Sequence, residues 1–186
     1  MRRMFGRARR GKKAQSSGND GLGGEPALAS MLSGDNPPIP YLSLLAPSEV
    51  EQFGRLPREA IVGEFLHPPA AGRPLDPATL RINARFVHFV HVVIARWAPK
   101  SPEFASAAER QRDGWIYVLD ARTPTPEGRV PPEDILGAFE VRDGVVVADS
   151  YQPFPEHMVF TERGVVQLTP FLRERFVLEL NQLPAD

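Results

Sequence analysis

The stretch from Asp76 to Trp97, DPATLRINARFVHFVHVVIARW, carries the longest periodic pattern in the chain. At 100° per residue its apolar side chains gather on one half of a helical wheel and most of its basic ones on the other. The apolar set is Leu80, Ile82, Phe86, Val87, Phe89, Val90, Val93, Ile94 and Trp97. This pattern predicts a long amphipathic helix as the main packing element. A buried strand over Phe86–Ile94 is the alternative, because Val, Ile and Phe also favour strands.

Further helices are predicted from their start signals. The run Ser48-Glu-Val-Glu51 has the spacing of a capping box and predicts a short helix to about Arg55. Residues 57–66 read as a second short helix, ended by two prolines. Ser101-Pro102 and Thr169-Pro170 place a capping hydroxyl before a proline that suits the first helical turn. They predict a helix over 101–112 and a C-terminal helix that covers one face of a sheet.

The period changes to that of strands after residue 113. Trp115–Leu119 is predicted to be a central strand, because it is a run of aromatic and β-branched residues. Asp143-Gly144 supplies the positive φ values of a type I′ turn and predicts a hairpin in which Val141 faces Val146. A second pairing is expected between residues 158–161 and 165–168. Residues 122–132 contain four prolines and are expected to form an exposed loop.

This order of elements defines the predicted fold class. Helices come first, an antiparallel sheet with the Asp143-Gly144 hairpin follows, and a C-terminal helix closes the fold, which is the segregated pattern of an α+β domain. Strands and helices do not alternate, and the chain has neither a GxGxxG nor a GxxxxGK loop. A doubly wound nucleotide-binding fold is therefore not expected.

Length and composition predict one domain behind a tail. The chain has 186 residues, 42% of them hydrophobic, and no cysteine, so disulfides, thiolate metal sites and a cysteine nucleophile are excluded. Residues 1–36 are poor in large apolar side chains and are predicted to be a disordered tail, with Ala27–Leu32 at most a helical turn. Residues 37–186 are predicted to be a single α+β domain. No stretch is long and apolar enough to predict a membrane span.

The tail is strongly basic. Its first 13 positions hold seven cations and no acid, and the rest of the chain then has fifteen basic residues against all 23 acidic ones. We expect the tail to contact polyanions such as nucleic acid or an anionic membrane surface in a salt-sensitive manner. The residues of this expected polyanion site are Arg2, Arg3, Arg7, Arg9, Arg10, Lys12 and Lys13. The absence of an apolar signal region predicts a cytoplasmic protein, with organellar import an alternative if the source is eukaryotic.

Catalytic and metal-binding motifs are mostly missing. The chain has no HExxH, GxSxG, EF-hand or Cys/His zinc spacing, and no cofactor is expected. His88 and His91 lie three residues apart on the predicted helix, near enough to share a metal ion. A carboxylate and imidazole set could assemble from strand ends and loops, where sites tend to form. Its candidate members are Asp120, Asp149, Glu156 and His157.

Two functions remain open on this basis. The first is a non-enzymatic binding or adaptor domain whose sheet and hairpin present a surface to a partner protein, because an open antiparallel sheet leaves strand edges. The alternative is a small enzyme that uses an Asp or Glu together with His157. The distance from this imidazole to a carboxylate, and the access of a substrate to the pair, distinguish the two.

Overall fold

The computed structural model describes residues 27–30, 40–70, 72–122 and 129–184. The helices in this part are α1 (Pro47–Phe53), α2 (Ala84–Trp97), α3 (Pro102–Gln111) and α4 (Pro170–Gln182). The first strands are β1 (Ala27–Ser30), β2 (Pro40–Ser43), β3 (Ile61–Phe65), β4 (Leu80–Ile82) and β5 (Gly114–Leu119). The later strands are β6 (Ile135–Arg142), β7 (Val145–Val146), β8 (Gln152–Pro153), β9 (Phe160–Thr161) and β10 (Gly164–Val165). Short 3₁₀ turns are η1 (Arg58–Ala60), η2 (Pro77–Thr79), η3 (Ala98–Lys100) and η4 (Pro132–Asp134).

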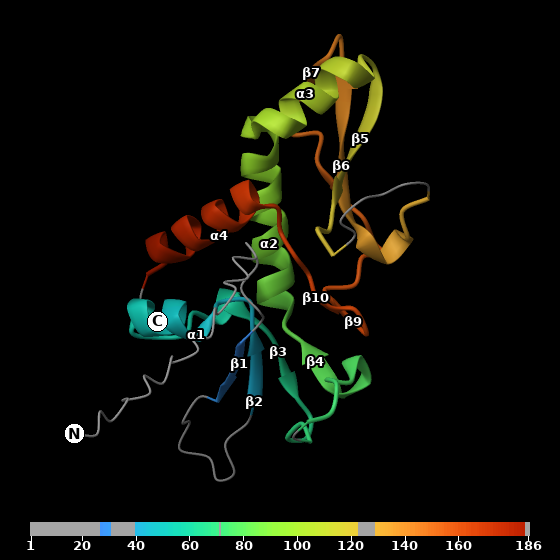
Figure 1. Cartoon of the computed structure of the whole chain (residues 1–186). Coiled ribbons are helices and arrows are strands. Elements are labelled where there is room, and N and C mark those ends of the chain that lie inside the picture. The colour runs from blue at the N-terminus through green and yellow to red at the C-terminus, as the bar shows by residue number, and fades with distance from the viewer. Residues whose placement is uncertain (1–26, 31–39, 71, 123–128, 185–186) are drawn as a thin grey trace, which may run out of the picture.

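Helix α2 runs through the middle of the molecule between two antiparallel sheets (Figure 1). The first sheet, of strand order β1-β2-β3-β4, lies at the N-terminal end of α2. The second has β6 in its middle, with β5 on one side and β7 and β8 on the other, and it lies toward the C-terminal end of α2. The mixed α and β composition agrees with the prediction. The predicted order of helices before a sheet is wrong, because the whole first sheet precedes α2.

Helix α2 begins eight residues later than predicted. Asp76 caps only the turn η2, its side chain accepting from the Ala78 amide. Residues 80–82 then pair with β3, with Gly63 opposite Ile82, and this strand interrupts the apparent helical wheel. The helix is capped by Asn83, whose side chain accepts from the Arg85 amide at 3.0 Å and donates to the Ile61 carbonyl at 2.8 Å. A helical pattern and a strand that share one apolar face cannot be separated by periodicity alone.

Two further predictions for this region need correction. Residues 57–66 form turn η1 and strand β3 instead of a helix, because the β-branched and aromatic residues of β3 are buried between β2 and β4. Helix α1 is confirmed, but its capping residue is Ala46 rather than Ser48. Glu49, and not Glu51, returns the hydrogen bond, accepting from the Ala46 amide at 2.7 Å.

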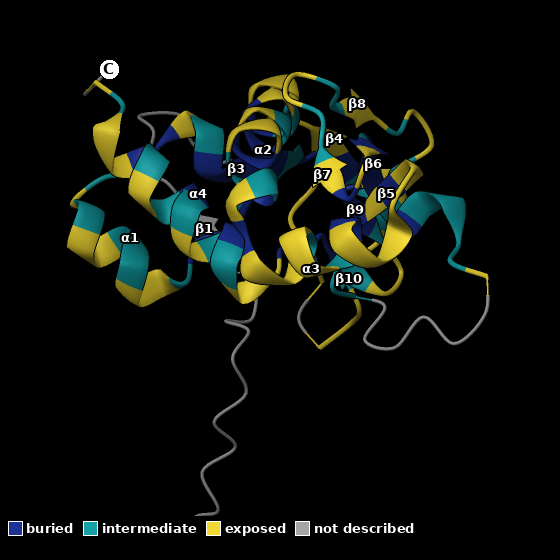
Figure 2. Cartoon of the chain, turned by 90° about the horizontal axis from the view of Figure 1, so that it is seen from above, coloured by how far each residue is buried: buried dark blue, intermediate teal, exposed yellow. Residues whose placement is uncertain are grey.

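One apolar core joins the two ends of the molecule. Figure 2 shows its buried residues along α2 and the inward faces of the strands, with exposed residues on the outer faces of α1 and α3. Phe86, Val90 and Val93 are fully buried as predicted, and Trp97 is partly buried. Helix α4 packs on α2 and not on a sheet face, because Phe176 inserts edge-on against Phe86 and Phe89, with ring centroids 6.2 and 5.3 Å apart.

The hairpin prediction is confirmed. Asp143 and Gly144 have φ values of 50° and 79°, as a type I′ turn requires, and Val141 faces Val146. The second predicted pairing is also present, with Phe160 opposite Val165. Strand β5, by contrast, is not central. Among the described residues it pairs only with β6, so it forms an edge of its sheet.

Strand β1 lies inside the range assigned to the tail. Residues 27–30 pair with β2, so a strand stands where a helical turn was expected. The remaining tail, including the seven predicted polyanion-binding residues, lies outside the described residues, and its affinity for polyanions stays a prediction. None of the helices in the described ranges has the length and apolar character that crossing a membrane requires.

Candidate functional site

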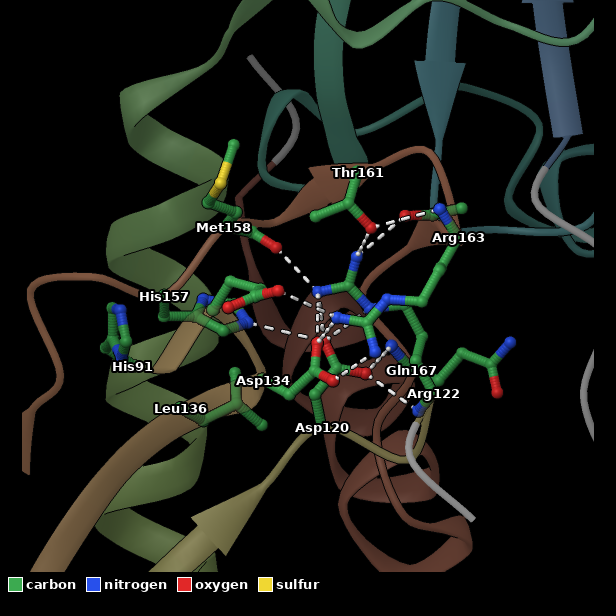
Figure 3. Close-up of polar contacts among 12 residues, drawn as sticks. His91, Asp120, Arg122, Asp134, Leu136, His157, Met158, Thr161, Arg163 and Gln167 are labelled. Carbon is green, nitrogen blue, oxygen red and sulfur yellow. Dashed lines mark hydrogen bonds and ion pairs between the residues drawn. The ribbon is translucent and has the colours of Figure 1, made fainter. Parts of the chain in front are cut away.

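One carboxylate of the candidate set lies in contact with the candidate imidazole. His157 lies after β8 and Asp120 directly after β5, and His157 Nε2 is 3.3 Å from Asp120 Oδ2 (Figure 3). Both side chains are buried, with 3% and 0% of their surface exposed. The two residues are 37 positions apart, and strand β5 and the chain after β8 bring them together. Of the four candidates in this set, the structure therefore joins one carboxylate and the histidine.

Asp120 is saturated by donors. Its Oδ1 accepts from the backbone amides of Arg122 and Gln167 at 3.0 and 2.9 Å. Its Oδ2 accepts from Arg122 Nε at 2.9 Å, besides its contact with His157. Burial alone would raise the pKa of Asp120, but the hydrogen bonds from His157, Arg122 and Gln167 outweigh it and lower this pKa. The group is therefore an ionised carboxylate without a free lone pair for a substrate.

Arg122 is the centre of the cluster. Its side chain is only 1% exposed, whereas the sequence predicts an exposed loop from this residue onward. Its guanidinium donates to Thr161 Oγ1, to the Gly164 carbonyl and to the Met158 carbonyl at 2.9, 2.8 and 2.6 Å. These bonds attach the β9-β10 hairpin to the end of β5. Arg122 therefore holds two parts of the fold together.

A second ion pair completes the cluster (Figure 3). Asp134, at the end of η4, is fully buried and lies 2.7 Å from the half-exposed Arg163. It also lies 3.7 Å from Arg122. Buried charges are tolerated when each one is paired and hydrogen-bonded, and this condition holds for both aspartates. The geometry is that of a structural ion cluster.

The other predicted site residues do not join this cluster. Asp149 and Glu156 are exposed, and no contact places either one at His157. Asp149 has a φ of 59° and is a turn residue. His88 is exposed on α2, and the described residues contain no group of three or more metal-ligating side chains.

His91 has a structural contact. Its Nδ1 lies 2.8 Å from Tyr151 Oη, and this hydroxyl donates to the Leu136 carbonyl at 3.2 Å. Burial, with smaller contributions from His157 and His88, lowers the pKa of His91 to about 4. The imidazole is therefore neutral near pH 7. Burial also raises the pKa of Tyr151, so its hydroxyl keeps its hydrogen. Tyr151 and His91 pack β6 against α2.

Strand β5 has an open edge. The Glu140 carbonyl accepts from the Val147 amide at 2.9 Å, so the backbone of Glu140 faces β7 and that of its neighbours Phe139 and Val141 faces β5. The residues opposite these two are Ile116 and Gly114, which therefore bond to β6. Backbone groups alternate along a strand, so the N–H and C=O groups of Trp115 and Tyr117 point away from the sheet. Within the described residues no strand pairs with that edge.

The side chains of the same two residues are exposed. Trp115 and Tyr117 are 41% and 54% exposed. The residues that alternate with them, Ile116 and Val118, are buried. A cavity of about 370 Å³ lies beside the end of the strand, between it and the first turns of α3 and α4. Its apolar lining includes Phe104, Tyr117, Val118, Leu119, Pro170 and Phe171. Neither His157 nor Asp120 lines it.

A second, larger hollow lies beside α1 and the start of α2. Arg55, Arg58, Arg81 and Arg85 line it. Most of its charge is already compensated, because Arg81 pairs with Glu64, Arg85 with Glu59, and Arg55 donates to the carbonyls of residues 183 and 184. It is less suited to a ligand than the apolar cavity.

Comparisons with known proteins give no family. No protein-family model, no curated protein and no solved structure matches the chain significantly.

Sequence reasoning found Asp120 and His157 but missed Arg122 and the open edge. The acceptors of Arg122 in and beside the β9-β10 hairpin lie 36 to 42 residues further along the chain, so spacing gives no sign of them. A weak sign for the edge exists. In GWIYVL the largest aromatic residues alternate with aliphatic ones, as in a strand with one exposed face.

Proposed function

We propose that this chain is a non-enzymatic protein-binding domain that takes up an extended segment of a partner protein along the open edge of β5. The observation that carries the proposal is the outward direction of the backbone groups of Trp115 and Tyr117. A partner strand would satisfy these groups with main-chain hydrogen bonds, which is the chemistry of β-strand addition. Exposed aromatic residues beside it provide the apolar area that such docking buries.

The composition of β5 supports this proposal. Proteins protect an edge strand with charged residues, proline or a bulge that turns it away. Along the part of β5 from Gly114 to Val118 the register with β6 is regular, and this segment contains neither a charged residue nor proline. An unprotected aromatic and β-branched edge would favour aggregation unless a partner covers it.

The enzyme alternative is less well supported. A histidine that acts as a general base needs one ring nitrogen bonded to its carboxylate partner and the other ring nitrogen within reach of the substrate. The His157 side chain is 3% exposed, and Asp120 is held by Arg122 and two backbone amides. The pair therefore has the contact but not the access that catalysis requires. The hydrogen bonds and ion pairs of His157 and Asp120 are those of groups that stabilise the fold.

Substitutions at Tyr117 distinguish binding through the backbone edge of β5 from binding through the aromatic side chain. Peptides selected from a random phage-displayed library on the full chain are expected to bind Tyr117→Pro about tenfold or more weakly, because proline removes the outward N–H. Tyr117→Val is the matched control, since it removes the same aromatic ring but keeps the N–H and the strand preference. Affinities are measured by fluorescence polarisation, and folding by circular dichroism.

The contrast between these two variants decides the proposal. Equal binding to the proline and valine variants would overturn it, as would a library that yields no binder. If Tyr117→Pro fails to fold, Trp115→Lys replaces it, because an edge lysine blocks strand addition while the fold is kept. Light scattering on the free chain provides a further test. A stable dimer that Trp115→Lys dissociates would mean that a second copy, and not a partner protein, covers the edge.

A further inference from the structure

Two cations lie next to residues that line the cavity beside β5, although neither lines it. Lys100 Nζ lies 4.2 Å from the centre of the Trp97 ring, and the Arg175 guanidinium lies 5.0 Å from the same ring. Arg175 also lies 5.1 Å from the ring of Phe171, which lines the cavity. Lys100 directly precedes Ser101, another lining residue. Two cations from different segments therefore contact the same Trp97 ring, and one of them also contacts Phe171, which lines the cavity.

These two cations lack carboxylate partners in the described part of the chain. The nearby Glu179 is already used, because it accepts from Trp97 Nε1 at 2.8 Å and pairs with Arg96 at 3.0 Å. No ion pair within the described residues includes Lys100 or Arg175, and Arg175 Nε is buried without an acceptor there. Contacts with aromatic rings leave the hydrogen-bonding capacity of both groups unused.

We propose that the docking segment of the partner places a large apolar side chain in this cavity and an acidic side chain beside it, against Lys100 and Arg175. This inference rests on the proposed function and names the chemistry of the segment. The cavity volume of about 370 Å³ is ample for an aromatic or a large aliphatic side chain. A carboxylate next to it would supply the acceptor that both cations lack.

The distribution of charge restricts where the acid lies. Glu103, at the start of α3, also lines the cavity, and the Ser101 hydroxyl donates to it at 2.8 Å. That hydrogen bond lowers the pKa of Glu103, so this side of the cavity is anionic and would repel an acidic segment. The acidic group therefore lies on the α4 side, near Phe171. The net negative charge of the remaining chain has little influence there, because salt screens exposed charges over about 10 Å.

The test is a selection of random peptides on phage against the full chain, followed by matched synthetic peptides. We expect the selected sequences to be enriched in Asp or Glu next to an aromatic or large aliphatic residue. In the best binder, replacing the acid with Gln should weaken binding about threefold to tenfold at low salt, and about 0.5 M salt should remove most of this difference. Lys100→Gln should reduce the preference for the acidic peptide. Arg85→Gln is the matched control, because it removes one exposed cation at the opposite end of α2.

Each outcome separates the two proposals. Binders without acidic enrichment, or equal binding of the Glu and Gln peptides, would overturn the acidic-segment inference and leave strand docking intact. Equal effects of Lys100→Gln and Arg85→Gln would also overturn the acidic-segment inference, because the preference for acidic peptides would then come from the net charge of the chain. A selection without any binder sensitive to Tyr117→Pro would overturn both proposals.

Discussion

Replacing Asp120 with Ala is expected to lower the free energy of unfolding by about 3–5 kcal/mol, the range for breaking a buried ion pair from one side. The reason is the Arg122 guanidinium, which is 1% exposed and would lose its closest carboxylate. It would retain Asp134 at 3.7 Å, and this contact cannot replace the two-point contact with Asp120. Urea unfolding followed by circular dichroism measures the change.

Asp149→Ala is the matched control for this prediction. Asp149 is a candidate of the same residue type, but it is exposed, so its replacement breaks no buried ion pair. Ala fits the φ of 59° at this position less well than Asp does, so Asp149→Ala is expected to cost about 1 kcal/mol. Equal losses in the two variants would show that the ion cluster contributes little to the fold. The structural interpretation of Asp120 and His157 would then be wrong.

Replacing Phe176 with Ala is expected to cost about 3–5 kcal/mol as well, the range for removing a buried aromatic side chain. Phe176 is fully buried between Phe86 and Phe89, so the substitution leaves a cavity at the contact between α2 and α4. Leu178→Ala on the same helix is the control. Leu178 is 41% exposed and should cost less than about 1 kcal/mol. Similar denaturation midpoints for the two variants would contradict the packing of α4 on α2.

The correct sequence predictions depend on local chemistry. Asp143-Gly144 specifies its own turn, because only residues that accept positive φ fit a type I′ hairpin. Thr169 and Pro170 likewise specify where α4 starts, since the capping hydroxyl and the fixed φ act within one turn. Neither signal needs knowledge of what the element packs against.

The incorrect predictions depend on distant contacts. Leu80–Ile82 joins β3 because Gly63 lets the Arg81 backbone approach closely, and a Cβ there would lie 2.5 Å from the Arg81 carbonyl oxygen. Arg122 is buried because its acceptors come from the β9-β10 hairpin. The pairing of His157 with Asp120 could be anticipated from residue type, but its inaccessibility could not. Whether β5 lies at an edge depends on which strands pair, and spacing does not determine this.

Amide hydrogen exchange along β5 tests the central claim most directly. In the free chain the amides of Ile116 and Val118 should exchange roughly a hundredfold or more slowly than those of Trp115 and Tyr117, because only the first two bond to β6. A peptide that docks on the edge should then slow Trp115 and Tyr117 selectively. Equal protection of all four amides in the free monomer would mean that the edge is already covered. That result would contradict the proposal that β5 receives a partner strand.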